Sequence, residues 1–166
     1  GKTSYWRRID PQTMPAQAKA TGIYLNSVLA HLDAEKQGFD EAIFLNTAGN
    51  VAEGPGENIF IVKEEKLFTP PLSDGILEGV TRDSVTAIAR DIGYEVIEEH
   101  VALDELYTAD EAFLTGTAAE ITPIRSVDDR VIGAGKRGPV TEEIQKKFFE
   151  IVNAREEKYL NWLDFI

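Results

Sequence analysis

Four short glycine-rich polar segments lie between the apolar runs of the chain, and each holds residue types that could take part in chemistry. Gly79-Val80-Thr81 lies where a helix is expected to begin, and the free backbone N–H groups and dipole of a helix N-terminus favour a phosphate. Each segment also has an ordinary structural interpretation, as a solvated lysine, a polar turn, a capped helix start or a tight turn. The four segments are residues 18–22, 53–58, 77–83 and 115–120.

Several familiar catalytic and nucleotide-binding patterns are incomplete in this sequence. Gly54-Pro55-Gly56 begins like a dinucleotide fingerprint but lacks its third glycine, and residues 133–137 lack the leading glycine and the hydroxyl residue of a P-loop. His31 and His100 have no metal-binding spacing around them, so we expect no metal site. No Gly-x-Ser-x-Gly elbow is present. Common hydrolase and nucleotide-binding functions are therefore disfavoured.

The composition excludes further classes. The 166 residues carry a net charge of -12, which argues against nucleic acid binding, since that requires a basic surface. There is no cysteine, so disulfides, thiolate catalysis and thiolate zinc sites are ruled out. The sequence has no apolar run of the roughly 18 residues that a membrane span requires, and its start lacks an apolar signal core. We expect a soluble, cytoplasmic protein.

The elements that must position these segments alternate between helices and strands. Leu25, Val28, Leu29 and Leu32 have helical spacing, and Thr81 is expected to cap a second helix that ends near Gly93. Hairpin signals recur, so we expect a mixed sheet rather than a strictly parallel one. The expected helices are residues 24–36, 81–92 and 140–155, and the expected strands are 41–46, 58–62, 66–69, 94–101, 111–115 and 121–126.

Taken together, the segments resemble a known family in both order and spacing. Lys19 followed by Tyr24-Leu25-Asn26-Ser27, and later Glu53-Gly54-Pro55-Gly56-Glu57-Asn58-Ile59-Phe60, resemble the class IV aminotransferases, which use pyridoxal 5'-phosphate. Glu57 favours the branched-chain amino-acid type within that family. The remaining matching motifs are Thr69-Pro70-Pro71, Leu77-Glu78-Gly79-Val80-Thr81-Arg82-Asp83, Ala109-Asp110-Glu111-Ala112-Phe113 and Gly116-Thr117-Ala118-Ala119-Glu120-Ile121-Thr122-Pro123.

The resemblance implies roles for residues that would contact the cofactor ring. Lys19 matches the catalytic lysine that holds the cofactor as a Schiff base and shuttles the alpha proton. Tyr24 matches the residue that hydrogen-bonds the phenolic oxygen of the cofactor. Glu53 matches the carboxylate that pairs with the pyridine nitrogen and keeps it protonated. Asn58 would help to hold that region, and Leu77 matches the residue packed against one ring face.

The resemblance also implies how the phosphate and the substrate are held. Gly79, Val80 and Thr81 match the phosphate-binding start of a helix. Thr117 matches a second phosphate contact, and Thr117 and Ala118 match the donors toward the substrate carboxylate.

The implied fold is α/β, with a mixed sheet partly closed into a barrel and flanked by helices, as in the large C-terminal domain of enzymes like D-amino-acid aminotransferase. Residues 1–166 would form that cofactor-binding domain. Relatives carry an N-terminal domain that supplies an arginine to the phosphate and much of the side-chain pocket, and this domain is absent from the chain.

The implied reaction is ping-pong transfer of the amino group between branched-chain L-amino acids and 2-oxoglutarate, in a homodimer or larger homo-oligomer. We expect the 166 residues alone to be poorly active. Two alternatives remain open at this point: a class IV relative acting on D-amino acids or aminodeoxychorismate, or a non-catalytic domain that binds only a cofactor or a partner. No nucleic acid or membrane partner is expected.

Overall fold

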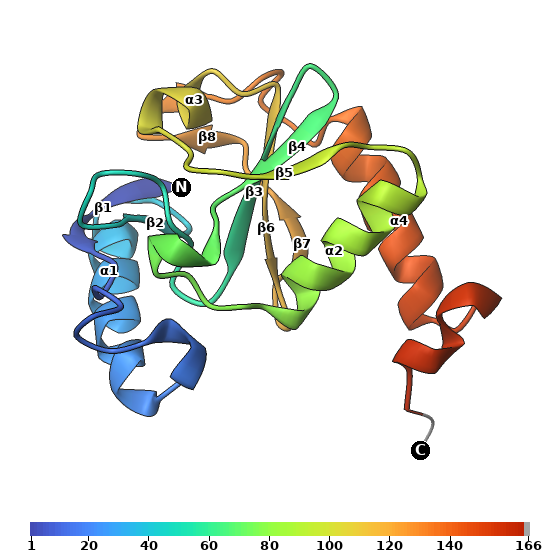
Figure 1. Cartoon of the computed structure of the whole chain (residues 1–166). Coiled ribbons are helices and arrows are strands. Elements are labelled where there is room, and N and C mark those ends of the chain that lie inside the picture. Colours follow the sequence, from blue (N-terminus) through green and yellow to red (C-terminus); the bar gives the residue numbers. More distant parts are fainter. Residues whose placement is uncertain (165–166) are drawn as a thin grey trace.

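The computed structural model describes residues 1–164, and a five-stranded mixed sheet lies at its centre (Figure 1). The strand order is β5-β4-β3-β6-β7, with β4 and β5 parallel and the other neighbours antiparallel. This confirms the expected α/β class with a mixed sheet. The strands are β3 (Asn58–Lys63), β4 (Lys66–Thr69), β5 (Val96–Glu98), β6 (Glu111–Gly116) and β7 (Glu120–Pro123).

The middle of the sheet forms because β3 is a run of β-branched and aromatic residues that is buried on both faces. Phe60 on β3 and Phe113 on β6 are registered partners whose rings stack with centroids 5.2 Å apart. Thr69 ends β4 and donates its hydroxyl to the Ile59 carbonyl at 2.9 Å. The sheet is thereby a rigid support for the loops that leave its ends.

Two smaller sheets accompany the central one. β1 (Lys2–Arg7) pairs with β2 (Ala42–Leu45) in parallel, and the crossover between them contains helix α1 (Tyr24–Lys36). β8 (Ser126–Val127) pairs with β9 (Arg130–Val131). Isolated bridges join Leu45 to Val51 and Val51 to Val101, but the strands of residues 1–164 do not close into a barrel.

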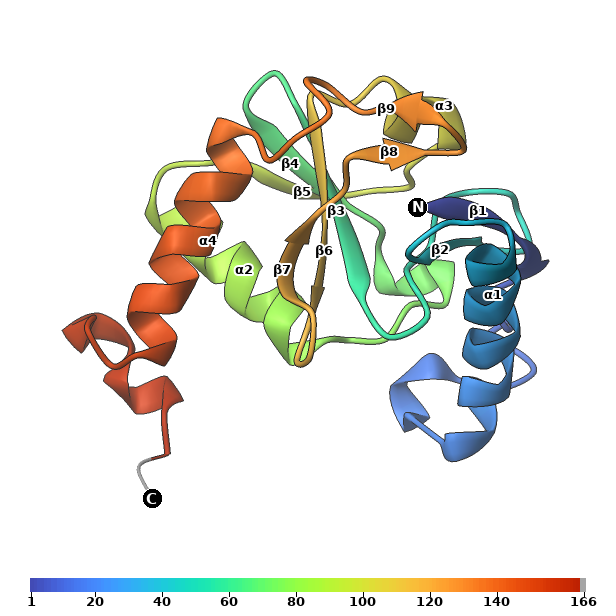
Figure 2. The ribbon, with the colours of Figure 1, turned by 180° about the vertical axis from the view of Figure 1, so that it is seen from behind.

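The helices cover different parts of the sheets, as the two opposite views show (Figures 1 and 2). Helices α2 (Val80–Asp91) and α4 (Pro139–Val152) pack together on one face of the central sheet. Helix α1 lies on the other side of the molecule, against β1 and β2. The short α3 (Leu103–Tyr107) and the 3-10 helices η1 (Ala16–Ala18), η2 (Thr21–Ile23), η3 (Leu72–Asp74) and η4 (Glu157–Trp162) complete the order. No helix in residues 1–164 is long and apolar enough to cross a bilayer.

The apolar stripe of α1 points to solvent rather than into the core. Leu25, Val28, Leu29 and Leu32 are between 38% and 67% exposed, whereas the helix buries small residues, Ser27, Ala30 and Ala34. Small side chains let the helix lie close to the backbones of β1 and β2, so the larger residues remain on the outer face. The helical spacing therefore predicted the helix correctly but not the face that it buries.

The remaining boundaries differ from expectation for local reasons. The N-cap of α2 is Gly79, two residues before the expected cap Thr81, and the helix begins at Val80. The strand expected at residues 94–101 shrinks to β5 because its neighbour β4 has only four residues. The strand expected at 121–126 divides near Pro123 into β7 and β8. Helix α4 ends at Val152, just before Ala154 adopts a positive φ of 58°. β1 and α3 were not expected.

Asp128 ties the start of the chain to the β8–β9 turn, and its replacement by asparagine should destabilise the fold. It accepts hydrogen bonds from Lys2 Nζ at 2.8 Å, Thr3 N at 3.0 Å, the Thr3 hydroxyl and Tyr107 Oη at 2.7 Å. Asparagine tolerates the positive φ of 50° but loses the charge and one acceptor oxygen. We expect the free energy of unfolding, measured by urea denaturation, to fall by about 1–3 kcal/mol.

The pH dependence gives a second signature. Burial alone would raise the pKa of Asp128, but the donors from Lys2, Thr3 and Tyr107 outweigh it and lower the pKa to about 2. A carboxylate with a depressed pKa stabilises the fold above its ordinary pKa of 3.8, and this contribution is lost as the pH falls toward 2. Asp128→Asn should lack that component. The exposed neighbour Asp129, also at positive φ, provides the control Asp129→Asn, which should be neutral. Equal effects of the two would contradict this role.

Candidate active site

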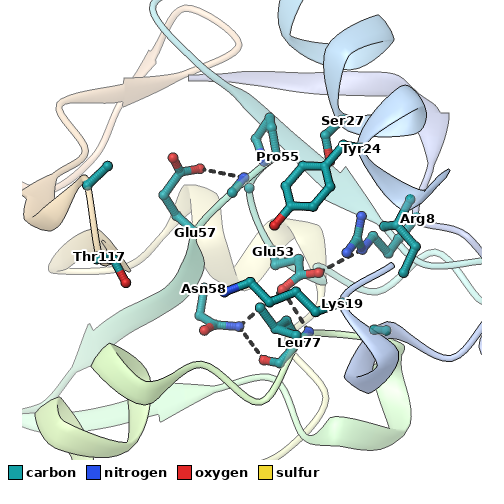
Figure 3. Close-up of a pocket in the computed structure, with 15 residues that line it drawn as sticks. Arg8, Lys19, Tyr24, Ser27, Glu53, Pro55, Glu57, Asn58, Leu77 and Thr117 are labelled. Carbon is teal, nitrogen blue, oxygen red and sulfur yellow. Dashed lines mark hydrogen bonds and ion pairs between the residues drawn. The ribbon is translucent and has the colours of Figure 1, made fainter. Parts of the chain in front are cut away.

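A cavity of about 230 Å³ lies between the start of α1 and the ends of β3 and β6 (Figure 3). It brings together segments that are far apart in the sequence: the end of β1, the turns before α1, the loop before β3, and the turn between β6 and β7. Its lining includes seven predicted site residues, namely Lys19, Tyr24, Glu53, Asn58, Leu77, Thr117 and Ala118. The other lining residues are Arg8, Ala16, Ile23, Ser27, Gly54, Pro55, Gly56 and Glu57.

Lys19 reaches the cavity from a tight backbone corner. It follows η1, has a left-handed φ of 44°, and donates its backbone N–H to the Ala16 carbonyl at 3.0 Å. A non-glycine residue in this conformation costs of the order of 1 kcal/mol or more, and such residues cluster at functional sites. Tyr24 opens α1 five residues later, with its hydroxyl directed into the cavity (Figure 3). Both residues line the cavity.

Glu53 is held on the floor of the cavity and is only 3% exposed. Its Oε2 accepts the Leu77 backbone N–H at 3.0 Å and the Asn58 side-chain amide at 3.1 Å. The same amide nitrogen donates to the Leu77 carbonyl at 2.8 Å, so Asn58 fixes both the carboxylate and the backbone beside it. Burial raises the pKa of Glu53 to about 7, although Arg8 and the Leu77 N–H oppose that shift.

The other carboxylate oxygen, Oε1, shows that this site fits a cationic or N–H-bearing ring. It lies 2.6 Å from Arg8 Nε as an ion pair, yet it makes no hydrogen bond of ordinary geometry within residues 1–164. The buried Ser27 hydroxyl in the same lining also lacks a partner there. Buried polar atoms normally find partners. A buried carboxylate whose Oε1 keeps acceptor capacity beside Arg8 suits the protonated ring nitrogen of pyridoxal phosphate.

Only some of the residues predicted to bind the phosphate and the substrate line this cavity. Thr117 and Ala118, on the β6–β7 turn, line the cavity, and Thr117 lies across it from Arg8 (Figure 3). Gly79, Val80 and Thr81 do not line it; they follow Leu77 at the start of α2, where Val80 is 80% exposed. The first N–H groups of any helix have no partner within the helix. The phosphate site at α2 therefore stays a prediction.

Gly79 is nevertheless constrained by the site. A Cβ atom at this position would lie 2.1 Å from Asn58 Oδ1, which no side chain can tolerate without movement. Gly79→Ala should therefore displace Asn58, break its bonds to Glu53 and Leu77, and lower the free energy of unfolding by about 1–3 kcal/mol. Chemical denaturation and the Asn58 side-chain NMR signals would measure both effects. Gly22→Ala is the control, because the nearest atom to its new Cβ lies 3.7 Å away; an undisturbed Asn58 amide in Gly79→Ala would contradict the expected clash.

Two charged lining residues were not among the predicted site residues. Arg8 is adjacent to the exposed Arg7, and nothing in the sequence distinguishes the two. In the sequence, Glu57 indicates only the branched-chain subfamily. Its Oε2 accepts the Gly56 N–H at 3.0 Å, and burial raises its pKa. No group of three or more His, Cys, Asp or Glu side chains in residues 1–164 is placed to hold a metal ion.

Comparisons with known proteins identify relatives of this arrangement. The family model for amino-transferase class IV matches residues 1–127. A probable branched-chain-amino-acid aminotransferase from Aquifex aeolicus is 49% identical over 163 residues, covering 98% of this chain and 52% of the relative. The chain thus spans about half the length of the curated relatives that it matches.

Solved structures give the same result. The branched-chain aminotransferase from Thermoproteus uzoniensis, crystallised with norvaline, is 54% identical with a TM-score of 0.95, covering 98% of this chain and 54% of that one. A T.th. branched-chain amino acid aminotransferase, complexed with N-(5'-phosphopyridoxyl)-L-glutamate, is 45% identical with a TM-score of 0.96, covering 99% of this chain and 55% of that one.

Proposed function

The chain belongs to the class IV aminotransferases, and we propose that it is the cofactor-binding part of an enzyme that moves amino groups between branched-chain L-amino acids and 2-oxoglutarate. The observation that carries this proposal is the single cavity that gathers Lys19, Tyr24, Glu53 and Thr117 from four separate segments. The names of the relatives support the substrate class, and the glutamate adduct in one related structure supports the second substrate.

Pyridoxal phosphate, when bound, supplies an electron sink for the negative charge that develops at the alpha carbon of the amino acid. Lys19 would hold it covalently through Nζ, and the same amine would carry the alpha proton of the amino acid. Glu53 would hold the ring nitrogen, with Asn58 orienting the carboxylate. Tyr24 would donate to the phenolic oxygen.

The remaining roles concern the ring face, the phosphate and the substrate. Leu77 would pack against the ring. Gly79, Val80 and Thr81 at the start of α2, together with Thr117, would donate to the phosphate. Thr117 and Ala118 would orient the carboxylate of the substrate, and the cavity walls would exclude water from the developing charge.

The wider architecture is part of the same proposal. Residues 1–166 would form the C-terminal domain of an enzyme whose N-terminal domain completes the pocket, and the isolated bridges at Val51 support partial closure of the sheets into a barrel. The exposed apolar face of α1 supports packing against further protein. We propose that the whole enzyme is a homodimer or larger homo-oligomer. The 166 residues alone would be poorly active. The cytoplasmic location stays a prediction.

The test is a substrate panel with the full-length protein and added pyridoxal phosphate. L-leucine, L-isoleucine and L-valine should each produce glutamate from 2-oxoglutarate, while D-alanine should not. Activity restricted to D-amino acids would replace the proposal with the D-amino-acid alternative. A protein that retains the cofactor but transfers no amino group would support the non-catalytic alternative.

A further inference from the structure

Arg8 is a buried arginine that touches the floor of the cavity from behind. It is 6% exposed and follows β1, where its backbone N–H donates to the Leu45 carbonyl at 2.9 Å. Its guanidinium carbon lies 5.6 Å from the centre of the Phe44 ring, a cation–π distance. β2 therefore holds both the backbone and the side chain of Arg8, and Nε lies 2.6 Å from Glu53 Oε1 (Figure 3).

Glu53 has two oxygens with different neighbours. Within residues 1–164, Oε2 receives only the neutral donors of Leu77 and Asn58, whereas Oε1 faces the single cation Arg8. A buried carboxylate without a paired cation takes up a proton, because the charged form is poorly solvated. A protonated Glu53 has no charge with which to hold a cationic ring nitrogen.

We propose that Arg8 is a positioning residue that acts through Glu53, keeping this carboxylate ionised and turning Oε1 toward the ring nitrogen of the cofactor. This role rests on the proposed function. It also explains how a buried carboxylate can carry a negative charge at neutral pH. Burial raises the pKa of Glu53 to about 7, and Arg8 is the group that lowers this pKa most strongly. Without Arg8, Glu53 should be mostly protonated at that pH.

The buried side chain of Arg8 also borders a second cavity. It lines a second cavity of about 310 Å³, together with Asp10, Asn46, Asp74 and His100. Arg8 Nη1 is buried and has no hydrogen-bond partner within residues 1–164. Asp74 accepts bonds from Asn46 and, through Oδ1, from His100 at 2.8 Å. This cavity gives a small planar cation a route to the position of the Arg8 side chain.

Other charged groups also face the pair and must be considered in any pH experiment. Glu57 lies in the cavity lining beside Glu53 and raises its pKa slightly, while Lys19 and Tyr24 approach from the turns before α1 and from its first residue. Asp10, Asp74 and His100 face Arg8 from the second cavity. Substitutions at Arg8 leave all of these groups in place, so a change in Glu53 titration reports the loss of Arg8.

The first test follows Glu53 in the full-length protein without cofactor, by NMR titration of ¹³C-labelled glutamate. Arg8→Met removes the charge at similar length, and the pKa of Glu53 should rise by about one unit or more. Arg8→Lys should restore part of the shift. In Arg8→Ala, millimolar guanidinium chloride should lower the pKa again, and equal urea should not.

The matched control is a second buried arginine outside the cavity lining. Arg82 pairs with Glu98 at 2.7 Å and donates to the Pro70 carbonyl at 3.1 Å. Arg82→Met should lower stability without moving the Glu53 titration. If Arg8→Met remains folded by circular dichroism and its Glu53 titrates as in the wild type, the proposal is wrong; a misfolded Arg8→Met leaves Arg8→Lys and the guanidinium experiment to decide.

The second test links the pair to the ring nitrogen through binding rather than turnover. Wild-type protein should bind pyridoxal phosphate more tightly than an analogue whose ring nitrogen is replaced by carbon, and Arg8→Met should reduce that preference about tenfold. An unchanged preference would overturn the link to the ring. Wild-type protein that binds neither compound would contradict the proposed function, whereas the Glu53 titration would still test Arg8 alone.

Discussion

Lys19→Ala in the full-length protein should reduce turnover of L-leucine and 2-oxoglutarate by about four orders of magnitude or more. The reason is that one amine performs two tasks, holding the cofactor and moving the alpha proton, and no other lysine of residues 1–164 lines the cavity. Alanine adopts the left-handed backbone of Lys19 about as readily as other L-residues do. The loss should therefore come from chemistry and not from unfolding.

The measurement is glutamate formation at saturating substrates, with circular dichroism to confirm the fold. Lys36→Ala, at the exposed end of α1, is the control for removal of a lysine and should retain full turnover. Turnover within tenfold of the wild type in Lys19→Ala would remove Lys19 from the mechanism.

Glu53→Gln should lower kcat by about 10²–10³-fold while weakening cofactor binding much less. Glutamine retains an oxygen for the Leu77 N–H but carries no charge, and the charge matters most as negative charge develops at the alpha carbon. The change also removes the ion-pair partner of Arg8, as protonation of Glu53 does when the pH falls through about 7. The double variant Arg8→Met/Glu53→Gln separates the two effects, because it removes the unpaired charge but does not restore kcat. Equal loss of kcat and cofactor affinity would contradict the assigned role.

The stability of the cofactor-free protein provides a pH signature for Glu53. Because the folded pKa of about 7 lies above the ordinary value of 4.5, this group favours folding fully below pH 4.5. That contribution, roughly 3 kcal/mol at most, is lost as the pH rises through about 7. Glu53→Gln should lack the decline, whereas a decline of the same size in the variant would assign it to another group.

The sequence predicted the parts of this fold that depend on local pattern. The apolar run of β3 and the periodic spacing in α2 and α4 need no tertiary information, and their cores agree with expectation. Boundaries failed where a neighbour set them, as for β5, whose length depends on the four residues of β4. The buried face of α1 also depends on tertiary packing, because the helix packs its small residues against β1 and β2 and leaves its leucines exposed.

In the candidate site, too, local motifs predicted some residues and only the folded structure revealed others. Lys19, Glu53 and Thr117 could be named from ordered motifs, and the cavity gathers them. Arg8 could not be named, because its role depends on Glu53, 45 positions away, and on burial that its neighbours in the sequence do not indicate. A long-range ion pair has no sequence period, so only the folded arrangement distinguishes Arg8 from Arg7.

The most direct test of the proposed function is to find where the cofactor is attached. Full-length protein with pyridoxal phosphate would be treated with sodium borohydride, which makes the link between a lysine amine and an aldehyde permanent, and its peptides would be mapped by mass spectrometry. We expect a single pyridoxyl group on Lys19, in the corner between η1 and η2. A label on another lysine, or labels scattered over exposed lysines, would contradict this assignment.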